Sequence, residues 1–209
     1  MNEMTPVQSV GVAKPLVDGP EKTTGKAMFA ADFQAAETLV GRILRSPVAH
    51  ANITAMDTSK AEALPGVHAV VTEADCSDTY GVLPIAMNEW ALARGRVRYR
   101  GEPVAAVAAV DVATAQRALD LIEVTYEELP AYFSAEEARA EGAVLLHDDK
   151  PGNIERDAEF DLGDVDNDMA EADLVREIEV KCSEVCQVQM EPHAAFAEYD
   201  GARERLTIR

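Results

Sequence analysis

Cysteine and histidine are the residue types best suited to nucleophilic or metal chemistry, and the chain has three cysteines and four histidines. Cys182 and Cys186 are four residues apart, a spacing that would bring two thiols together on one face of a helix. The alternating apolar pattern around them instead predicts a strand, in which they would lie roughly 13 Å apart. Two sulfurs at that separation cannot bind one zinc ion. Cys76 is isolated in an expected loop, so we interpret all three cysteines as structural thiols.

The four histidines do not form a catalytic pattern. His50, His68 and His193 are far apart in the sequence, and no serine or cysteine nucleophile adjoins any of them. His147 begins a His-Asp-Asp run of metal-ligand residue types, but adjacent residues in a loop point in different directions. The histidines are therefore expected to be structural. No residue is assigned a catalytic, cofactor-binding or metal-binding role.

Two short segments resemble ligand-binding loops without having the required residues. GPEKTTGKA resembles a phosphate-binding P-loop, but its glycines are one residue too far apart, and Ala27 stands where serine or threonine would bind magnesium. DVDND begins like a calcium loop, but Met169 and Val175 replace the required glycine and glutamate. We instead expect Asp164 to cap a short helix.

Composition limits the classes of protein that this chain can represent. Its 209 residues include 38 acidic and 19 basic ones, and the net charge of −19 repels nucleic acid phosphates and anionic membrane surfaces. No apolar run approaches the roughly 20 residues of a membrane span, and the first residues lack the pattern of a signal peptide. An odd number of widely spaced cysteines is typical of a reducing compartment. We expect a cytoplasmic globular protein that binds neither nucleic acid nor membrane.

The first elements that would position these residues form a strand, helix, strand unit after a proline-containing N-terminal arm. Alternation of apolar residues predicts the strands, and an N-cap followed by a Pro-Gly stop predicts the helix. In order, the expected elements are strands at Gly25–Phe33 and Leu39–Pro47, a short helix capped by Asp57 or Thr58, and a strand at Val67–Thr72.

A second unit contains the least polar stretch of the chain. Val104–Val110 follows a Gly-Glu-Pro turn and contains no charged residue. When crossover helices cover both faces of a strand, its sequence is a continuous apolar run. This stretch is therefore predicted to be a central core strand. Asp111 is expected to cap the next helix, and Glu123–Leu129 to return as a strand.

The remainder of the chain is more polar. SAEEARAEGA predicts a short helix, LLHDDKPGNI a loop, and the nine acids of Glu155–Asp173 a solvated connector. From Leu174, alternation predicts a long β segment that turns at DGARER into a last strand, LTIR. Because a lone terminal hairpin is marginal in water, we expect this segment to be the first piece of a larger sheet and the chain to be truncated.

Four segments carry a resemblance that covers most of the chain: VDGPEKTTGKAMFAADF, GRILRSPVAHANITAMDTSKAEALPGVHAVVT, VRYRGEPVAAVAAVDVATAQRALDLIEVTYEELPAY and QMEPHAAFAEYD. Together they resemble the N-terminal part of the large, molybdenum-carrying subunit of the xanthine dehydrogenase and aldehyde oxidase family. The resemblance implies an α/β (α+β) fold. It divides the chain into an N-terminal arm (1–19), an α/β hammerhead domain (20–133), a connector (134–173) and the truncated first strands of a molybdopterin-binding domain (174–209).

Within that family, two segments are most similar to the alpha subunit of the 4-hydroxybenzoyl-CoA reductase branch. They are YGVLPIAMNEWALARGRVRYRGEP and LLHDDKPGNI. The implied reaction is reductive removal of a phenolic hydroxyl to give benzoyl-CoA. A segment of a xanthine, purine or aldehyde dehydrogenase is an alternative, and so is a non-catalytic interaction module with the hammerhead fold.

The resemblance also implies the cofactors and partners of a complete enzyme. These are molybdenum bound to molybdopterin cytosine dinucleotide in the full subunit, and [2Fe-2S] clusters and FAD on partner subunits. The family's molybdenum-holding loops and its general-base glutamate come after the position of Arg209. No site residue can therefore be carried over, and the chain alone is expected to be inactive and to bind no metal or flavin. The expected partners are the remainder of the molybdopterin-binding subunit, an iron-sulfur subunit and an FAD subunit.

Overall fold

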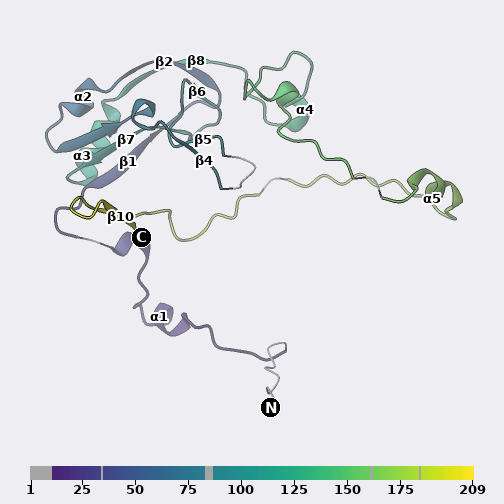
Figure 1. Cartoon of the computed structure of the whole chain (residues 1–209), viewed down its shortest axis with the longest axis horizontal. Coiled ribbons are helices and arrows are strands. Elements are labelled where there is room, and N and C mark those ends of the chain that lie inside the picture. The colour runs from purple at the N-terminus through teal and green to yellow at the C-terminus, as the bar shows by residue number, and fades with distance from the viewer. Residues whose placement is uncertain (1–10, 34, 83–86, 161, 184) are drawn as a thin grey trace. The chain divides into compact units, whose positions relative to one another are not determined.

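The computed structural model describes residues 11–33, 35–82, 87–160, 162–183 and 185–209 (Figure 1). Contacts divide the described residues into two compact units. The larger unit is Glu37–Glu179, and the smaller one joins the described residues before Glu37 to Val180–Arg209. Two three-stranded sheets belong to the larger unit.

The larger unit contains a three-stranded antiparallel sheet with the apolar stretch at its centre. The strand order is β1 (Val40–Arg45), β7 (Pro103–Ala109), β3 (Val67–Val71). Val107 lies opposite Arg42 of β1 on one side and Val70 of β3 on the other. The central position predicted for this apolar stretch is confirmed.

Burial along β7 alternates between two clusters. Ala105, Val107 and Ala109 are at most 2% exposed and pack with buried residues of helix α3 (Val112–Asp120). The small side chains on both elements allow the helix to approach the sheet closely. On the other side, Val104 is fully buried in a second cluster. β7 therefore connects both parts of the core.

The second sheet is also antiparallel, with the order β6 (Arg96–Val97), β2 (Ala51–Asp57), β8 (Glu123–Glu128). The expectation of a strand, helix, strand unit with β7 buried by crossover helices is therefore wrong in its pairing. β7 and β8 lie in different sheets, and α3 connects the sheets. The physical reason is that β1 and β3 already occupy both edges of β7, so β8 pairs with β2 instead.

The helix boundaries follow the predicted signals. Asp111 accepts a hydrogen bond of 2.7 Å from the Thr114 backbone N–H at the start of α3, as an N-cap does. Helix α2 (Ser59–Glu62) begins after Thr58, and the Asp57 carboxylate accepts a bond of 2.9 Å from the N–H of Ser59. Both capping predictions are confirmed in position.

Gly66 ends the α2 segment in a conformation that requires glycine. Its φ is +93°, and a Cβ there would lie 3.0 Å from a methyl of Val110 and 3.2 Å from a methyl of Thr114. Its carbonyl accepts a bond of 2.9 Å from the Val110 N–H. The Pro-Gly stop therefore also brings the backbone close to the start of α3.

The rest of the larger unit consists of short elements. The predicted polar helix is confirmed as α4 (Ala135–Ala138), which Ser134 caps. The capping of α5 (Val165–Glu171) by Asp164 is also confirmed. The described residues of the acidic stretch 155–173 are exposed. The other short elements are η2 (Glu73–Asp75), β4 (Thr79–Tyr80), β5 (Glu89–Trp90) and η3 (Pro151–Asn153).

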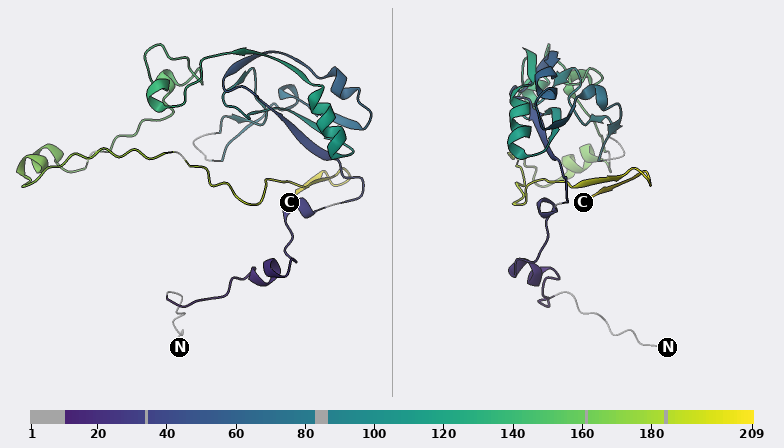
Figure 2. Two further views of the ribbon diagram at one scale, coloured as in Figure 1. Left: turned by 180° about the vertical axis from the view of Figure 1, so that it is seen from behind. Right: turned by 90° about the vertical axis from the view of Figure 1, so that its left-hand side faces the viewer.

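The smaller unit consists of α1 (Gly19–Thr23), η1 (Ala30–Asp32) and a hairpin of β9 (Ala197–Asp200) and β10 (Arg205–Ile208) (Figure 2). The Phe33 ring lies 6.4 Å from that of Phe196, and the Arg209 guanidinium lies 5.6 Å from the Phe33 ring. These contacts fix Phe33 to the base of the hairpin.

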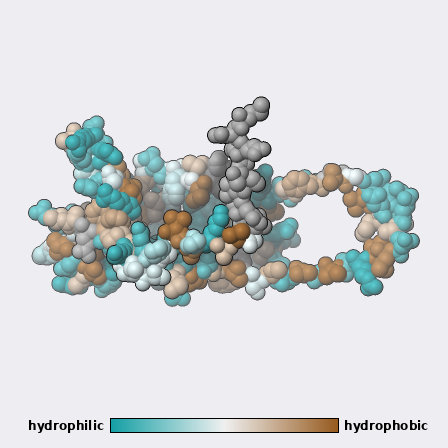
Figure 3. All heavy atoms as spheres, turned by 90° about the horizontal axis from the view of Figure 1, so that it is seen from below, coloured by the Kyte–Doolittle hydropathy of each residue, from teal (hydrophilic) through white to brown (hydrophobic). Residues whose placement is uncertain are grey.

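Two of the predicted strands do not form. Gly25–Phe33 contains η1, in which the Asp32 carboxylate accepts a bond from the Phe29 N–H, so local side-chain bonding replaces pairing. The described residues between Leu174 and Phe196 form no strand, because they have no neighbouring strand to pair with. Figure 3 shows apolar residues exposed along the extended chain next to α5. The predicted hairpin itself is confirmed.

Candidate functional site

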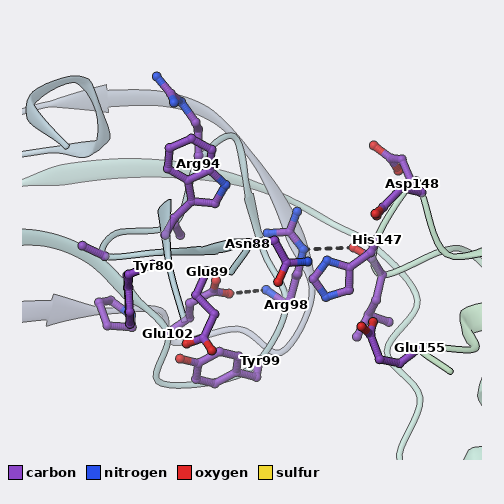
Figure 4. Close-up of a pocket in the computed structure, with 16 residues that line it drawn as sticks. Tyr80, Asn88, Glu89, Arg94, Arg98, Tyr99, Glu102, His147, Asp148 and Glu155 are labelled. Atoms are coloured by element: carbon purple, nitrogen blue, oxygen red, sulfur yellow. Dashed lines mark hydrogen bonds between the residues drawn. The ribbon is translucent and has the colours of Figure 1, made fainter. Parts of the chain in front are cut away.

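The main candidate site is a cleft of about 860 Å³ in the larger unit (Figure 4). Strands β4 and β5, the turn between β6 and β7, and the 144–148 loop contribute its walls. Its lining combines aromatic rings with charged groups of both signs: Tyr80, Trp90, Tyr99, Arg94, Arg98, His147, Glu89, Glu102, Asp148, Asp149 and Glu155.

Two arginines of the RVRYR run hold one wall of this cleft. Successive strand residues point to opposite faces, so Arg96 and Arg98 share a face while Val97 between them is fully buried. The Arg96 guanidinium donates to the carbonyl of Leu145 at 3.2 Å and to the carboxylate of Asp148 at 3.1 Å. The backbone of the 144–148 loop is thereby fixed to the edge of the second sheet.

The bonds of Arg96 to neutral groups contribute more than its ion pair. Its side chain is 23% exposed, whereas that of Asp148 is 85% exposed, so solvent screens the pair. Arg96 also donates from Nε to the Asn52 side-chain oxygen at 3.1 Å. Arg98 adds a bond of 3.0 Å from Nε to the carbonyl of Leu146.

The opposite side of the 144–148 loop is held by Asn153. Its amide nitrogen donates to the carbonyls of Ala138 and Val144, at 2.8 and 3.1 Å, and its oxygen accepts from the Leu146 N–H at 2.8 Å. Asn153 has a φ of +56°, a conformation that asparagine tolerates better than most residues. The Tyr132 hydroxyl accepts from the Val144 N–H at 2.9 Å. The loop is therefore bonded on both sides.

Charged side chains lie close to two aromatic residues of the cleft, Trp90 and Tyr99. The Arg94 guanidinium lies 4.6 Å from the centre of the Trp90 ring, within cation–π range. Burial raises the pKa of Tyr99, and the nearby carboxylate of Glu102 raises this pKa further, while Arg45 acts in the opposite direction. The surroundings of the Tyr99 hydroxyl are therefore negative on balance.

The histidines are not brought together. His147 lies at the cleft, whereas His68 and His193 are exposed. His50 is 2% exposed, and its Nδ1 lies 2.7 Å from the carbonyl of Pro130, to which it donates. Its buried Nε2 has no hydrogen-bond partner among the described residues. His50 thus ties the start of β2 to the chain after β8, as expected of a structural residue.

The cysteines also occupy separate environments. Cys76 is half-buried, Cys182 and Cys186 are exposed, and all three are free thiols. Within the described ranges, no three histidine, cysteine, aspartate or glutamate side chains are grouped in a way that could hold a metal ion.

Sequence reasoning considered the His147-Asp148-Asp149 run only as a metal site and missed the other residues of the cleft. The signal was present in the RVRYR alternation, which places charged residues on one face of a strand, and in the polar loop LLHDDKPGNI. The two segments are about 50 residues apart in the sequence, however, and neither one indicates which other segment it contacts. Only the fold brings Arg96 and Arg98 to the 144–148 loop.

The fold and cleft define a small mixed α/β domain whose described residues form two three-stranded antiparallel sheets and the pair β4–β5, followed by an exposed acidic stretch. Residues 24–130 match the family described as "Aldehyde oxidase and xanthine dehydrogenase, a/b hammerhead domain". Residues 146–209 match "Molybdopterin cofactor-binding domain". The chain belongs to the aldehyde oxidase and xanthine dehydrogenase family, and its larger unit has the hammerhead fold followed by the start of the molybdopterin-binding domain.

Similar proteins include components of two bacterial dehydrogenases. The nicotinate dehydrogenase large molybdopterin subunit of Eubacterium barkeri is 35% identical over 92% of this chain and 45% of that protein. A probable xanthine dehydrogenase component of Bacillus subtilis (strain 168) is 37% identical over 88% of this chain and 25% of that protein. The chain therefore spans less than half the length of either relative.

A solved structure has the same fold. Quinoline 2-oxidoreductase from Pseudomonas putida 86 matches with a TM-score of 0.81 and 32% identity, over 92% of this chain and 25% of that chain. The likeness thus extends over nearly all of this chain.

The acidic stretch 155–173 does not by itself fit a molybdopterin cofactor. A phosphate-bearing cofactor requires a concentration of hydrogen-bond donors or positive charge. The described part of 155–173 is instead exposed and strongly acidic.

Among the residues that the structure describes, none of the helices combines the length and apolar character needed to cross a membrane.

Proposed function

We propose that this chain is the N-terminal segment of the large subunit of a molybdenum-dependent oxidoreductase. The observation that carries the proposal is the pair of family matches, to a hammerhead domain over 24–130 and to a molybdopterin-binding domain over 146–209. The hammerhead segment serves as a scaffold in this proposal, and the chemistry takes place on residues outside the chain. Accordingly, no residue of the chain is proposed to be catalytic or to bind a metal.

The proposed substrate class is an aromatic nitrogen heterocycle. Nicotinate, xanthine and quinoline appear in the names of the three similar proteins, and each is a ring that contains nitrogen. A carbon beside the ring nitrogen is electron-poor and open to attack by oxygen derived from water. The net reaction replaces that C–H bond with C–OH, consumes one water, and releases two electrons and two protons.

The complete enzyme is proposed to contain molybdopterin cytosine dinucleotide in the full subunit, with the electrons passing to [2Fe-2S] clusters and FAD on partner subunits. A cytoplasmic location is part of the same proposal. These details rest on the resemblance of the sequence to the family. Reductive dehydroxylation of 4-hydroxybenzoyl-CoA is a second candidate, supported by the two segments YGVLPIAMNEWALARGRVRYRGEP and LLHDDKPGNI.

The test is purification of the native complex through an affinity tag on this chain. We expect molybdenum, iron and flavin in the complex, and oxidation of nicotinate, hypoxanthine or quinoline coupled to an artificial electron acceptor. Activity only with 4-hydroxybenzoyl-CoA and a strong reductant would replace the first substrate class by the second. A tagged chain that co-purifies with no molybdenum and no further subunit would refute the enzyme proposal.

A further inference from the structure

The cleft has the side-chain composition of a surface that binds another polypeptide. Tyr80 and Tyr99 line it and are 49% and 55% exposed, and Trp90, whose ring Arg94 covers, lines it as well. Tyrosine, tryptophan and arginine are the residues enriched at the energetic centres of protein interfaces. Exposed rings at the wall of a concave surface can bury much apolar area against a single inserted side chain.

The charges that line the cleft are unevenly compensated. Three carboxylates are already bonded: Asp148 to Arg96, Glu155 to Lys150, and Glu102 to the backbone N–H of Arg98. Glu89 and Asp149 have no ion-pair partner in the part of the chain that the structure describes. The lining therefore contains unmatched negative charge.

The two arginines of the cleft offset only part of this charge, and neither has an ion pair with a carboxylate among the described residues. Arg94 lies over the Trp90 ring, and Arg98 donates to the carbonyls of Leu146 and Arg96 rather than to a carboxylate. Figure 4 shows Glu89 and Glu102 on the same side of the cleft as the Tyr99 ring. Both carboxylates contribute to the raised pKa of Tyr99, after its burial, which agrees with a negative potential beside that ring.

We propose that this cleft docks an arginine or lysine side chain presented by a loop of a partner polypeptide. The cation lies over the Tyr99 ring, next to the carboxylates of Glu89 and Glu102. A cation within about 6 Å of an aromatic ring is attracted to its face, and carboxylates beside the ring strengthen that attraction. Arg94 on Trp90 is an example of the same contact within this chain. The net charge of −19 further favours a basic partner over an acidic one.

Trp90 makes the proposal directly testable, because it is the single tryptophan of the chain and lines the cleft. Its fluorescence therefore reports occupancy of the cleft rather than binding elsewhere. The probes are the capped peptide GGRGRGG and its counterpart GGEGEGG, titrated into the 209-residue chain. We expect a saturable change with the arginine peptide that weakens as salt is added, and no change with the glutamate peptide.

Charge-matched variants separate the cleft from the overall field of the protein. Glu89→Gln should weaken binding of the arginine peptide about fivefold, the loss expected for one partly screened charge contact. Glu128→Gln removes the same charge from an exposed position on β8 outside the cleft lining, and should leave the affinity unchanged within about twofold. Tyr99→Leu, which keeps every charge, should weaken binding through loss of the ring.

Three results would overturn the proposal. The first is the absence of any Trp90 response at millimolar arginine peptide, and the second is tighter binding of the glutamate peptide. The third is equal weakening by Glu89→Gln and Glu128→Gln, which would assign the attraction to net charge alone. Thermal melting of each variant checks that it is folded, and Asp149→Asn provides a second cleft variant should Glu89→Gln fail this check.

Discussion

Replacement of Arg96 by alanine should release the 144–148 loop from the second sheet. The variant loses the charge-assisted bond of 3.2 Å to the carbonyl of Leu145, and such a bond contributes about 1.5–3 kcal/mol. The bond of Arg96 to Asn52 joins two strands of the second sheet and does not reach the loop, so it is not counted. The exposed pair with Asp148 adds little. We expect a net loss of about 2 kcal/mol in the stability of the closed loop, equivalent to an about 30-fold rise in its open population.

Hydrogen exchange is the appropriate assay because two loop amides are bonded in the closed form. The Val144 N–H donates to Tyr132, and the Leu146 N–H donates to Asn153. Their exchange should accelerate about 30-fold in the Arg96→Ala variant, in proportion to the open population. Amides of β7 should keep their rates, since the core is unchanged.

Arg100→Ala is the matched control for this experiment. Arg100 belongs to the same RVRYR run, is exposed, and has no hydrogen bond to other described residues. Its replacement should leave the exchange of Val144 and Leu146 within about twofold of the parent. Asp148→Asn should have a similarly small effect. If Arg96→Ala and Arg100→Ala accelerate the loop amides equally, the bonds of Arg96 do not hold the loop and the reasoning is wrong.

Three further predictions concern the core and its turns. Val107→Asp places an unpaired charge at a position that is 2% exposed, at a cost of several kcal/mol, about the stability of an ordinary domain; a soluble variant with an unchanged melting temperature would disprove its central position. Gly66→Ala should lower the melting temperature, because its Cβ would lie 3.0 Å from Val110 at a φ of +93°. Bonds from the backbone and side chain of Thr114 lower the pKa of Asp111 below 3.8. Asp111→Ala should therefore be less stable than the parent at neutral pH, and the difference measured by denaturant titration should shrink as pH falls below about 4.

Local signals predicted the elements of the larger unit well. The apolar run at Val104–Val110, the cap at Asp111 and the Pro-Gly stop at Gly66 all depend on residues close in sequence, and the structure confirms each of them. The pairing of strands could not be predicted in the same way. Alternation gives the faces of a strand but not its neighbours, and β8, expected in one strand, helix, strand unit with β7, pairs with β2 in the other sheet.

Alternation without a neighbour also explains the failed strands. The described residues between Leu174 and Phe196 have strand-like side chains, yet a strand is stabilised by its hydrogen bonds to a second strand. The hairpin of β9 and β10 forms because its turn supplies that second strand locally. The cleft residues were missed for the related reason that Arg96 and the 144–148 loop meet only through the tertiary fold.

The structural units and the family matches have different boundaries, because some side chains contact residues on the other side of a matched boundary. The match to the molybdopterin-binding domain starts at residue 146, yet Arg98 binds the Leu146 carbonyl to the second sheet of the hammerhead fold. Conversely, Phe33 lies within the hammerhead match but packs against Phe196 and Arg209. Each domain thus depends on a segment that sequence comparison assigns to the other. A chain divided between residues 130 and 146 would place the two partners of each contact in separate polypeptides.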